Sequence, residues 1–440
     1  MLSRFIFFSL CIVIIYTPIP LGANRIWASS SIEFYVFFIF TFHLLLSIQQ
    51  THKLLPPKYS LPVLIPLFIT VLWLVIQMLP WLGSTANRVT HTLSFDPSLT
   101  HIMLLKSLAF FMFTWLVFCY VNNKKRIYLF ALVMLISGLF QAIYGAWLNL
   151  NEGMVSPIFN VPYSQRATGS FMYQNQLANY LSLTLAIGIG LLISQLALIK
   201  SSLTFRQKTR DIALTILSAK MVIRISLIIM IICLILTRSR MGNSAFFIAL
   251  LLTSLFSFFF YNQKPKNLRL LIISFFILDL FLIGTIFGVE KVKKRLLETS
   301  LQSETRDEVV RDSLQIIFDY PIFGTGGGSF YSSFPSYHPE FYSGFYDHAH
   351  NDYIQFAVEL GLPVTILLGS MMLFCLFISL KTIVKRKTPL YQGISFGCAM
   401  AIFHMILHST VDFSLQSPAI AILFISILAL GLIVSEVKRT

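Results

Sequence analysis

The chain has 440 residues, of which 56% are hydrophobic and only 12% are charged, and its mean hydropathy is +0.77. This composition excludes an ordinary water-soluble domain, in which about a quarter of the residues are charged. The net charge is +15. The positions of the basic residues along the chain show whether this charge reflects membrane topology or a nucleic-acid partner.

Hydrophobic runs long enough to cross a bilayer recur from one end of the chain to the other. They predict an all-α integral membrane protein, a single polytopic domain over residues 1–440 with about twelve transmembrane helices. The first run is expected to be retained, because further spans follow it and no small-residue cleavage site is present. The expected spans are residues 4–21, 32–48, 62–82, 102–121, 127–149, 177–199, 221–237, 243–261, 268–289, 353–380, 391–411 and 418–435.

Basic residues set the expected orientation. If both termini are cytoplasmic, most of the 33 lysines and arginines fall on the cytoplasmic side, as the positive-inside rule requires. The positive net charge is therefore a topological signal, and no nucleic-acid partner is expected. Two longer loops, 150–176 and 290–352, fall on the extracytoplasmic side, and the second is expected to contain short amphipathic helices. The chemistry is expected on that face, in the loop 290–352.

Two arginines stand in the turn 237–242 (TRSRMG), between two expected spans. Arginine keeps its charge when partly desolvated and binds phosphate through two parallel hydrogen bonds. Snorkelling of helix-end arginines to the membrane interface is the simpler alternative. Snorkelling does not explain why these basic residues lie on the extracytoplasmic side, where fewer lysines and arginines are expected. We therefore favour an anion-binding role for Arg238 and Arg240.

The segment 303–318 has helical periodicity. Thr305 and Glu308 have the spacing of a capping box, which predicts a helix with Arg306 in its first turn. Free backbone N–H groups beside a cation would suit a phosphate. The alternative is an interfacial amphipathic helix whose charges, including Arg311, are solvated.

The segment 324–329 (GTGGGS) superficially resembles a phosphate-binding loop. No Gly-Lys-Ser/Thr follows it and no strand precedes it, as that motif requires. It also lies on the face that lacks nucleotides. We expect a flexible, close-packed loop.

The densest polar cluster is 346–352 (YDHAHND), beside an expected span. Such a cluster is costly next to hydrocarbon, which favours a chemical role. His348, His350, Asp347 and Asp352 could be metal ligands, but the run would need further ligands from elsewhere. A neutral histidine is better suited to take a proton from a hydroxyl. We therefore expect no metal and no cofactor.

A second polar group, His404, His408 and Asp412, is spaced along one helix face near the outer end of an expected span. These side chains either line the same cavity as the first cluster or make hydrogen bonds between helices. Both interpretations stay open at the level of sequence.

Together the arginines and histidines suggest a reaction on a lipid diphosphate. An acceptor hydroxyl would attack the anomeric carbon of the donor sugar. The arginines would stabilise the departing diphosphate without a metal ion.

Four stretches resemble the O-antigen ligase and O-antigen polymerase superfamily of bacterial membrane glycosyltransferases. The segment 166–178 resembles its Gly-Ser/Thr-Phe-x-x-x-Asn-x-x-Ala element, 236–240 its Thr-x-Ser-Arg element and 306–324 its Arg-x(n)-Asp-x-Pro-x-x-Gly segment. His350-Asn351, followed after nine residues by Gly361, resembles the His-Asn-x9-Gly-x-x-Gly pattern of ligases. Val364 stands where that pattern has its last glycine.

The resemblance implies a donor glycan on undecaprenyl diphosphate in the periplasmic leaflet. It implies that Arg240 and Arg306 bind the diphosphate, and that His350 activates or orients the acceptor hydroxyl. Asn351 is expected to cap the following helix. The secondary site candidates are Arg238, Arg311, His348, Asp347, Asp352 and Asn175.

The leading hypothesis is thus a metal-independent glycosyltransferase of the O-antigen ligase type, acting on lipid A core or another surface carbohydrate. It would be a multi-pass protein of the bacterial inner membrane, with both termini cytoplasmic and the site facing the periplasm. A polymerase that extends a growing glycan on the carrier is the next hypothesis, and a protein O-oligosaccharyltransferase the third. A lipid-linked glycan transporter would need charges along a transmembrane path, whereas only Lys106 and Arg224 are basic within the expected spans.

Overall fold

The computed structural model describes residues 2–48, 55–80, 92–162, 165–196, 219–260, 300–338 and 346–437, with only the backbone for Leu196, Ala219, Lys220 and 300–307. These residues form helices, and apart from one isolated bridge between Pro80 and Thr92 they contain no strand. The α-helices are α1 (Leu2–Tyr16), α2 (Ile26–Ile48), α3 (Leu61–Met78), α4 (Pro97–Tyr120), α5 (Lys124–Leu150), α6 (Gln174–Leu196), α8 (Ala219–Leu236), α9 (Arg240–Phe260), α12 (Ser300–Asp319), α13 (Phe330–Ser333), α14 (Asp352–Lys385), α15 (Pro389–His408) and α16 (Pro418–Glu436). Four short 3-10 turns accompany them: η1 (Leu21–Ala23), η2 (Lys58–Ser60), η3 (Phe334–Tyr337) and η4 (Ser414–Gln416).

The described part of the chain contains nine helices that are long and apolar enough to cross a membrane, and two shorter apolar helices, Leu2–Tyr16 and Met221–Leu236. Each coincides with an expected span to within a few residues. The chain is therefore a multi-pass membrane protein with an all-helical fold. The expected span 268–289 lies outside the described residues, so the count of twelve stays a prediction.

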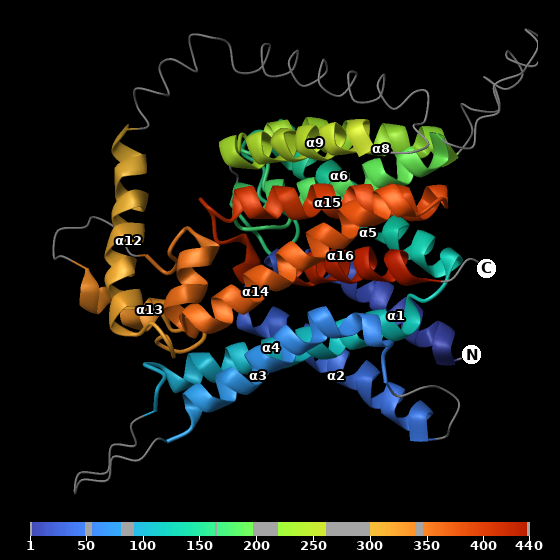
Figure 1. Ribbon diagram of the computed structural model, residues 1–440. Coiled ribbons are helices and arrows are strands. Elements are labelled where there is room, and N and C mark those ends of the chain that lie inside the picture. The colour runs from blue at the N-terminus through green and yellow to red at the C-terminus, as the bar shows by residue number, and fades with distance from the viewer. Residues whose placement is uncertain are drawn as a thin grey trace, which may run out of the picture.

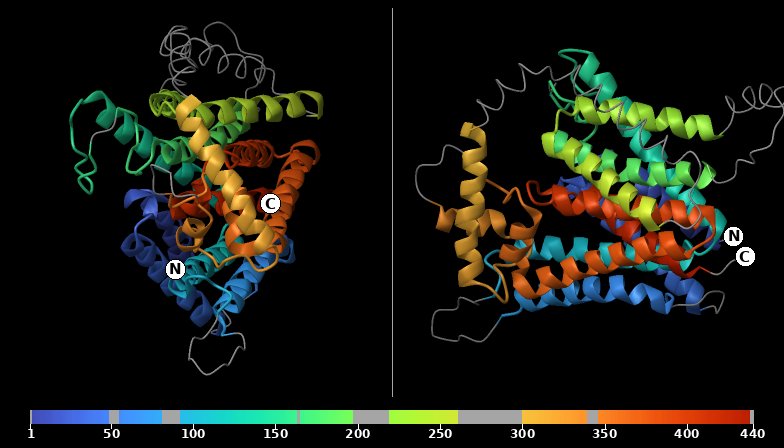
Figure 2. Two further views of the ribbon diagram at one scale, coloured as in Figure 1. Left: turned by 90° about the vertical axis from the view of Figure 1, so that its left-hand side faces the viewer. Right: turned by 45° about the horizontal axis from the view of Figure 1, so that its top comes forward.

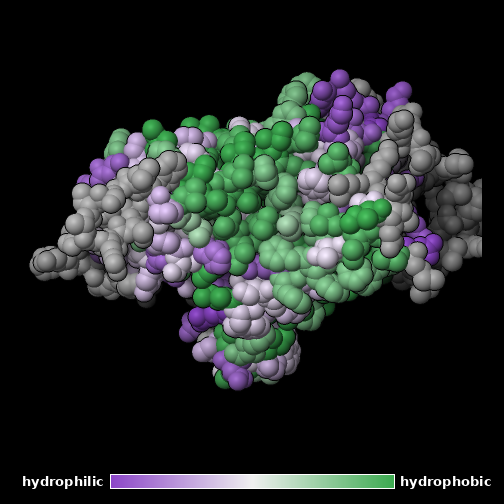
Figure 3. Space-filling model, turned by 90° about the horizontal axis from the view of Figure 1, so that it is seen from below, coloured by the Kyte–Doolittle hydropathy of each residue, from purple (hydrophilic) through white to green (hydrophobic). Residues whose placement is uncertain are grey.

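The apolar helices run side by side, and both termini lie at the same end of the bundle (Figure 1). Helices α12 and α13 and the start of α14 lie at the opposite end, where α12 runs across the bundle (Figures 1 and 2). Hydrophobic side chains cover the middle of the face seen in Figure 3, and hydrophilic ones gather toward its margins. This is the pattern expected of a bundle surrounded by lipid.

Helices α6, α15 and α16 form the centre of the bundle, and their residues are almost entirely buried. Glycines allow α6 and α15 to approach closely. A Cβ added at Gly190 would lie 2.3 Å from the carbonyl oxygen of Gly393, and one at Gly397 would lie 2.6 Å from that of Ala186. Small residues at helix contacts are the usual means of close packing within a membrane.

Helix α14 is broken near its start by Gly361, whose φ of 78° and ψ of 166° are not helical. The chain at residues 321–324 crosses this break. A Cβ at Gly361 would lie 2.1 Å from the carbonyl oxygen of Ile322, and a Cβ at Gly324 would lie 2.5 Å from that of Glu359. Only glycine fits at either position, which explains the spacing from His350 to Gly361.

The break leaves backbone carbonyls without helical partners, and other segments supply them. The backbone N–H groups of Thr325 and Gly326 donate to the carbonyls of Val358 and Glu359 at 2.8 and 3.0 Å. The indole N–H of Trp73 donates to the carbonyl of Leu360 at 2.9 Å. The glycine-rich segment 324–329 is thus a close-packed structural loop that holds residues 352–360 in place.

The prediction for the start of α12 was wrong. The helix is already formed at Ser300, so Thr305 is not its N-cap and Arg306 does not lie in its first turn. Thr305 and Glu308 have capping-box spacing but lie inside the helix, because the residues before them are also helical.

Candidate functional site

A polar cavity of about 340 Å³ opens among α4, the start of α6 and the start of α14. It lies near the end of the bundle that carries α12 and α13, as the positions of these helix starts show (Figure 1). Its polar and charged lining side chains are Asn24, Arg25, Lys106, Tyr173, Gln176, Asp347, His348, Gln355, Glu359 and Gln416. Residues from distant parts of the chain therefore meet there.

His348 is tied to α14 by a chain of hydrogen bonds. Nε2 of Gln355 lies 3.0 Å from Nδ1 of His348 and donates to Oε1 of Glu359, also at 3.0 Å. The other carboxyl oxygen of Glu359 accepts from the backbone N–H of Gly328 at 2.9 Å. Gln355 and Glu359 are 2% and 1% exposed. These buried hydrogen bonds therefore fix the position of the His348 imidazole in the cavity wall.

The ring of Phe413 joins the two histidines of the cluster. It stacks on His348 with ring centroids 4.2 Å apart and meets His350 edge-on at 5.0 Å. It also packs against Tyr173 at 6.0 Å. His348, Phe413 and Tyr173 line the cavity, whereas His350 is not among the residues of its wall.

Burial lowers the pKa of His348 below its ordinary value of 6.5. The Asp347 carboxylate, whose Oδ2 lies 4.0 Å from Nε2, and the hydrogen bond between His348 and the Gln355 side chain oppose this shift. Lys106 adds to the lowering, and Asp412 acts against it. Burial therefore favours the neutral form of His348.

His350 has a left-handed backbone, with φ of 51°. This conformation is uncommon for a residue other than glycine and persists only where the surroundings enforce it. Asn351 is the N-cap of α14, as predicted, and its Oδ1 accepts from the N–H groups of Tyr353 and Ile354 at 3.0 and 3.1 Å.

The two arginines of the 237–242 turn lie between α8 and α9. Ser239 caps α9 by accepting from the N–H of Gly242 at 3.2 Å, which places Arg240 in the exposed first turn of α9. Arg238 has a φ of 51°. The turn packs on the 166–178 segment, since a Cβ at Gly242 would lie 2.6 Å from that of Ala178. Neither arginine lines the polar cavity.

The other arginines of the site prediction lie in α12. Arg306 falls where only the backbone is described. The side chain of Arg311 is 71% exposed, and its Nε lies 3.5 Å from a carboxyl oxygen of Asp312. Asn175 is half-buried in the first turn of α6, between the cavity residues Tyr173 and Gln176.

Asp352 does not contact either histidine of the cluster. It is 1% exposed and accepts from the hydroxyl of Ser409 at 2.9 Å and from the N–H of Leu415 at 3.3 Å. These bonds fasten the 409–415 loop to the start of α14. We assign it this structural role rather than that of a base.

The second histidine group makes contacts between helices. Nδ1 of His408 lies 3.0 Å from Nδ2 of Asn179 on α6 and 3.8 Å from Oδ2 of Asp412. His404 and His408 are fully buried and do not line the polar cavity. Of the two interpretations, the structure supports helix-to-helix hydrogen bonding for His408.

Sequence reasoning missed several cavity residues, above all Lys106, Gln355 and Glu359. One signal was available, because ionisable residues inside expected spans are functional candidates by default. Gln355 and Glu359 are one helical turn apart and therefore lie on the same face of α14. His348 lies close to that face because α14 starts at Asp352, four residues after His348.

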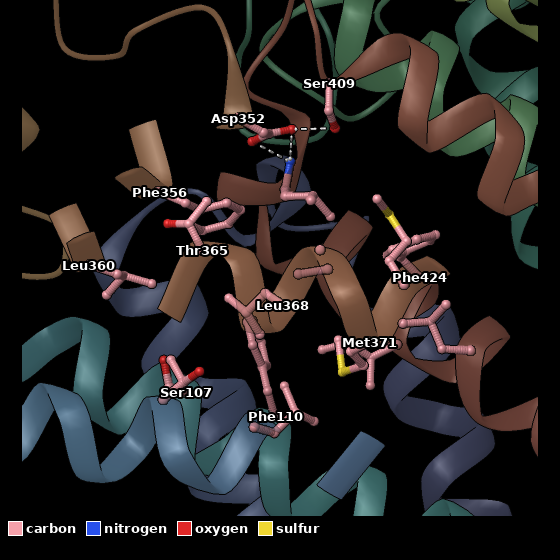
Figure 4. A pocket seen from close by; sticks show the side chains of 18 of the residues that line it. Ser107, Phe110, Asp352, Phe356, Leu360, Thr365, Leu368, Met371, Ser409 and Phe424 are labelled. Atoms are coloured by element: carbon pink, nitrogen blue, oxygen red, sulfur yellow. Dashed lines mark hydrogen bonds between the residues drawn. The ribbon is translucent and has the colours of Figure 1, made fainter. Parts of the chain in front are cut away.

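An apolar pocket of about 140 Å³ adjoins the polar cavity on the other side of the 352–360 segment, and Met103 lies in the wall of both. Figure 4 shows Asp352 and Ser409 at one end of this pocket and Ser107 and Phe110 at the other. Between them the lining is hydrophobic, from Phe356 and Leu368 of α14 to Phe424 of α16.

In the described residues no three His, Cys, Asp or Glu side chains are grouped so as to hold a metal ion. The cavity offers two cations (Arg25 and Lys106), two carboxyl groups (Asp347 and Glu359), neutral hydrogen-bonding groups and one imidazole. Such a set suits an anionic or sugar-bearing ligand.

The fold and the cavity define a multi-pass membrane protein with a polar site at one end of its bundle. Residues 225–369 match the O-antigen ligase family model. This match confirms, over residues 225–369, the resemblance to the O-antigen ligase and polymerase superfamily found in the motifs. The family indicates a glycosyltransferase-like enzyme with a ligase-type or polymerase-type function, whose partners are a lipid-linked glycan and a glycan acceptor. No curated protein matches the chain.

Proposed function

We propose that this protein transfers a glycan from undecaprenyl diphosphate to an acceptor hydroxyl at the periplasmic face of the inner membrane, in the manner of an O-antigen ligase. The acceptor is lipid A core or another surface carbohydrate. Both termini are then cytoplasmic, and the polar cavity faces the periplasm. The reaction uses no metal ion.

The observation that carries the proposal is the pairing of the polar cavity with the apolar pocket. They lie on two sides of the 352–360 segment and share Met103. A ligand with a charged head and a long hydrocarbon chain fits such a pair, because each part finds a matching environment. A polyprenyl diphosphate is a ligand of this kind.

His350 is the proposed group that activates or orients the acceptor. Two observations support this role: its enforced left-handed backbone and its contact with Phe413 in the cavity wall. Arg240 and Arg306 are the proposed diphosphate ligands, on the strength of the family motifs. Arg240 stands in the first turn of α9, where backbone N–H groups add to its charge.

The test uses the purified full chain with undecaprenyl-diphosphate-linked glycan and two acceptors supplied separately. Glycan appearing on lipid A core supports ligation. Transfer to protein acceptors alone would support an O-oligosaccharyltransferase. Movement of intact donor across vesicles without any transfer would replace the proposal with transport.

Polymerisation is the second candidate function, and one residue favours it. Val364 replaces the last glycine of the ligase pattern and is 3% exposed, packed with Leu74 and Leu360. The ligase pattern has a glycine without a side chain at this position, whereas here the side chain of Val364 packs against its neighbours. Ladders of glycan on the lipid carrier, with no product on lipid A core, would establish this function instead.

A further inference from the structure

Two segments that line the polar cavity contact each other although they are 152 residues apart in the sequence. Asn24 lies between η1 and α2, and Gln176 lies in the first turn of α6. The side-chain amide of Asn24 donates a hydrogen bond to Oε1 of Gln176 at 2.8 Å, and Arg25 and Tyr173 line the cavity beside them. None of these four side chains has a part in the proposed activation of the acceptor or in the proposed binding of the diphosphate.

A left-handed turn precedes Asn24 and Arg25 and places them in the cavity wall. Leu21, Gly22 and Ala23 have φ of 57°, 67° and 60°. Leucine and alanine rarely adopt this backbone, because their Cβ then comes too close to the following carbonyl oxygen. Such strained residues persist only where their surroundings enforce them, and they cluster at ligand-binding sites.

Three buried side chains from two other segments enforce the turn. The Ser170 hydroxyl donates to the carbonyl of Pro18 at 2.5 Å, and the Ser417 hydroxyl donates to the carbonyl of Gly22 at 2.9 Å. The ring of Phe171 packs directly on Gly22, where an added Cβ would lie 2.6 Å from Cδ1 of the ring. The position of Asn24 and Arg25 therefore depends on residues 170–171 and 417.

The sequence element that residues 166–178 resemble divides its positions in the same way. Ser170 and Phe171 occupy fixed positions of that pattern, and they hold the turn. Tyr173 and Gln176 occupy positions that the pattern leaves open, and both line the cavity. The fixed positions thus build this wall, and the open positions determine what it recognises.

The two amides offer a hydrogen-bond donor and an acceptor side by side. Neither amide makes a further side-chain hydrogen bond with the described residues. Whichever amide donates the bond between Asn24 and Gln176, the pair keeps one oxygen and at least one N–H group for a ligand. An acetamido group has the complementary N–H group and carbonyl oxygen.

Tyr173 adds an aromatic face to the same wall. It is 46% exposed and meets the ring of Phe413 edge-on, with ring centroids 6.0 Å apart. Burial raises the pKa of its hydroxyl, Asp347 raises it further and Arg25 lowers it, so both charged groups act on this side chain. An aromatic face beside amide and charged groups suits a sugar, which presents C–H groups on its faces and hydroxyl groups at its edge.

We propose that Asn24, Gln176 and Tyr173 form a subsite that recognises a sugar of the donor glycan and prefers one that carries an acetamido group. Ser170, Phe171 and Ser417 are positioning residues, which hold the left-handed turn and with it Asn24. The donor as the source of the sugar rests on the proposed function, in which the polar head of the donor occupies this cavity.

The binding test uses the purified full chain in detergent with three probes: undecaprenyl diphosphate, and the same carrier linked to glucose or to N-acetylglucosamine. Affinity of the wild-type protein should rise in that order. Gln176→Met should lower affinity for the acetamido probe about fivefold, the loss of one hydrogen bond, and should leave affinity for the bare carrier unchanged. The matched control is Gln315→Met, at an exposed glutamine of α12 that does not line the cavity.

The wild-type comparison needs no variant, so it decides the question even if Gln176→Met does not fold. Equal affinity of the wild-type protein for the three probes would overturn the proposal. A preference for the acetamido probe that persists in Gln176→Met would overturn it as well. Loss of binding to lipid A core in this variant, with donor binding intact, would assign the wall to the acceptor instead.

The positioning role is tested by selectivity rather than by stability. Ser170→Ala should reduce the ratio of kcat/KM for the acetamido donor over the glucose donor, and Ser170→Thr, which keeps the hydroxyl, should restore it. The control is Ser370→Ala, at an exposed serine of α14. An equal loss for both donors and for binding of the bare carrier in Ser170→Ala would show a structural role only and overturn the positioning role.

Failure of the subsite and failure of the proposed function give different results. Sugar-dependent binding without transfer to any acceptor would refute the proposed function alone. Transfer with the same preference for the acetamido donor in the wild-type protein and in Gln176→Met would refute this subsite alone.

Discussion

Phe413 stacks on His348 at 4.2 Å and presents the same ring to the edge of His350 at 5.0 Å. One aromatic side chain thus contacts both a histidine of the cavity wall and a histidine outside it. The two histidines, two residues apart in sequence, are given different surroundings and different expected roles.

His350→Ala should lower the transfer rate by about 10²–10⁴-fold, the range expected when a general acid or base is removed. Donor binding should stay close to the wild-type level, because His350 does not line the polar cavity. The measurement is single-turnover transfer together with donor affinity. Wild-type turnover in this variant would refute the role of His350, and His348→Ala serves as the comparison, with weakened donor binding expected.

Arg240→Ala should weaken donor binding or transition-state stabilisation by about 1.5–3 kcal/mol, the value of a hydrogen bond to a charged group. Arg240→Lys should recover only part of it, since an ammonium cannot form the paired hydrogen bonds of a guanidinium. The same pair of substitutions at Arg306 should behave alike. Arg311, which is 71% exposed, offers a control in Arg311→Ala with little expected change in donor KM. Full rescue by lysine would contradict a bidentate contact.

Gly361→Ala should destabilise the protein severely. The φ of 78° and ψ of 166° lie in a region that essentially only glycine adopts, which costs alanine about 1–3 kcal/mol, and the added Cβ would lie 2.1 Å from the carbonyl oxygen of Ile322. The matched control is Gly369→Ala in the same helix, where a Cβ meets nothing within 4 Å. That change should be neutral or stabilising by up to about 1 kcal/mol. Thermal unfolding in detergent measures both, and equal melting temperatures would show that the break in α14 is not needed.

The pKa of His348 should lie below 6.5 and fall further in Asp347→Asn, because the carboxylate of Asp347 partly offsets the effect of burial. A histidine with a lowered pKa in the folded state binds fewer protons than in the unfolded chain. Its contribution to stability is therefore unfavourable below pH 6.5 and disappears above it. Nitrogen-15 NMR titration measures the pKa, and melting temperatures at pH 5.5 and 7.5 measure the linkage. Glu152→Gln, an exposed acid on the 150–176 loop, is the control, and a raised pKa in Asp347→Asn would contradict the assignment.

The sequence alone predicted the helices well. Each span that falls on described residues was placed to within a few residues, because a bilayer admits only backbone that satisfies its own hydrogen bonds and the length of an apolar run then identifies the helix. It also predicted the cap at Asn351 and the family. These are local properties, which can be predicted from residues that are close together in the sequence.

The make-up of the site depended on tertiary structure. Lys106 of α4, Gln176 of α6 and His348 of the segment before α14 share one cavity, and no local sequence pattern predicts that these three parts of the chain meet. Gln355 and Glu359 join His348 in a chain of hydrogen bonds, while His350 contacts the ring of Phe413 and does not line the cavity. Lateral packing of membrane helices is decided by the fit of small side chains and a few buried hydrogen bonds, and hydrophobicity does not distinguish one neighbour from another. The sequence therefore determined the class of protein and its helices, and the packing of those helices decided which polar side chains meet.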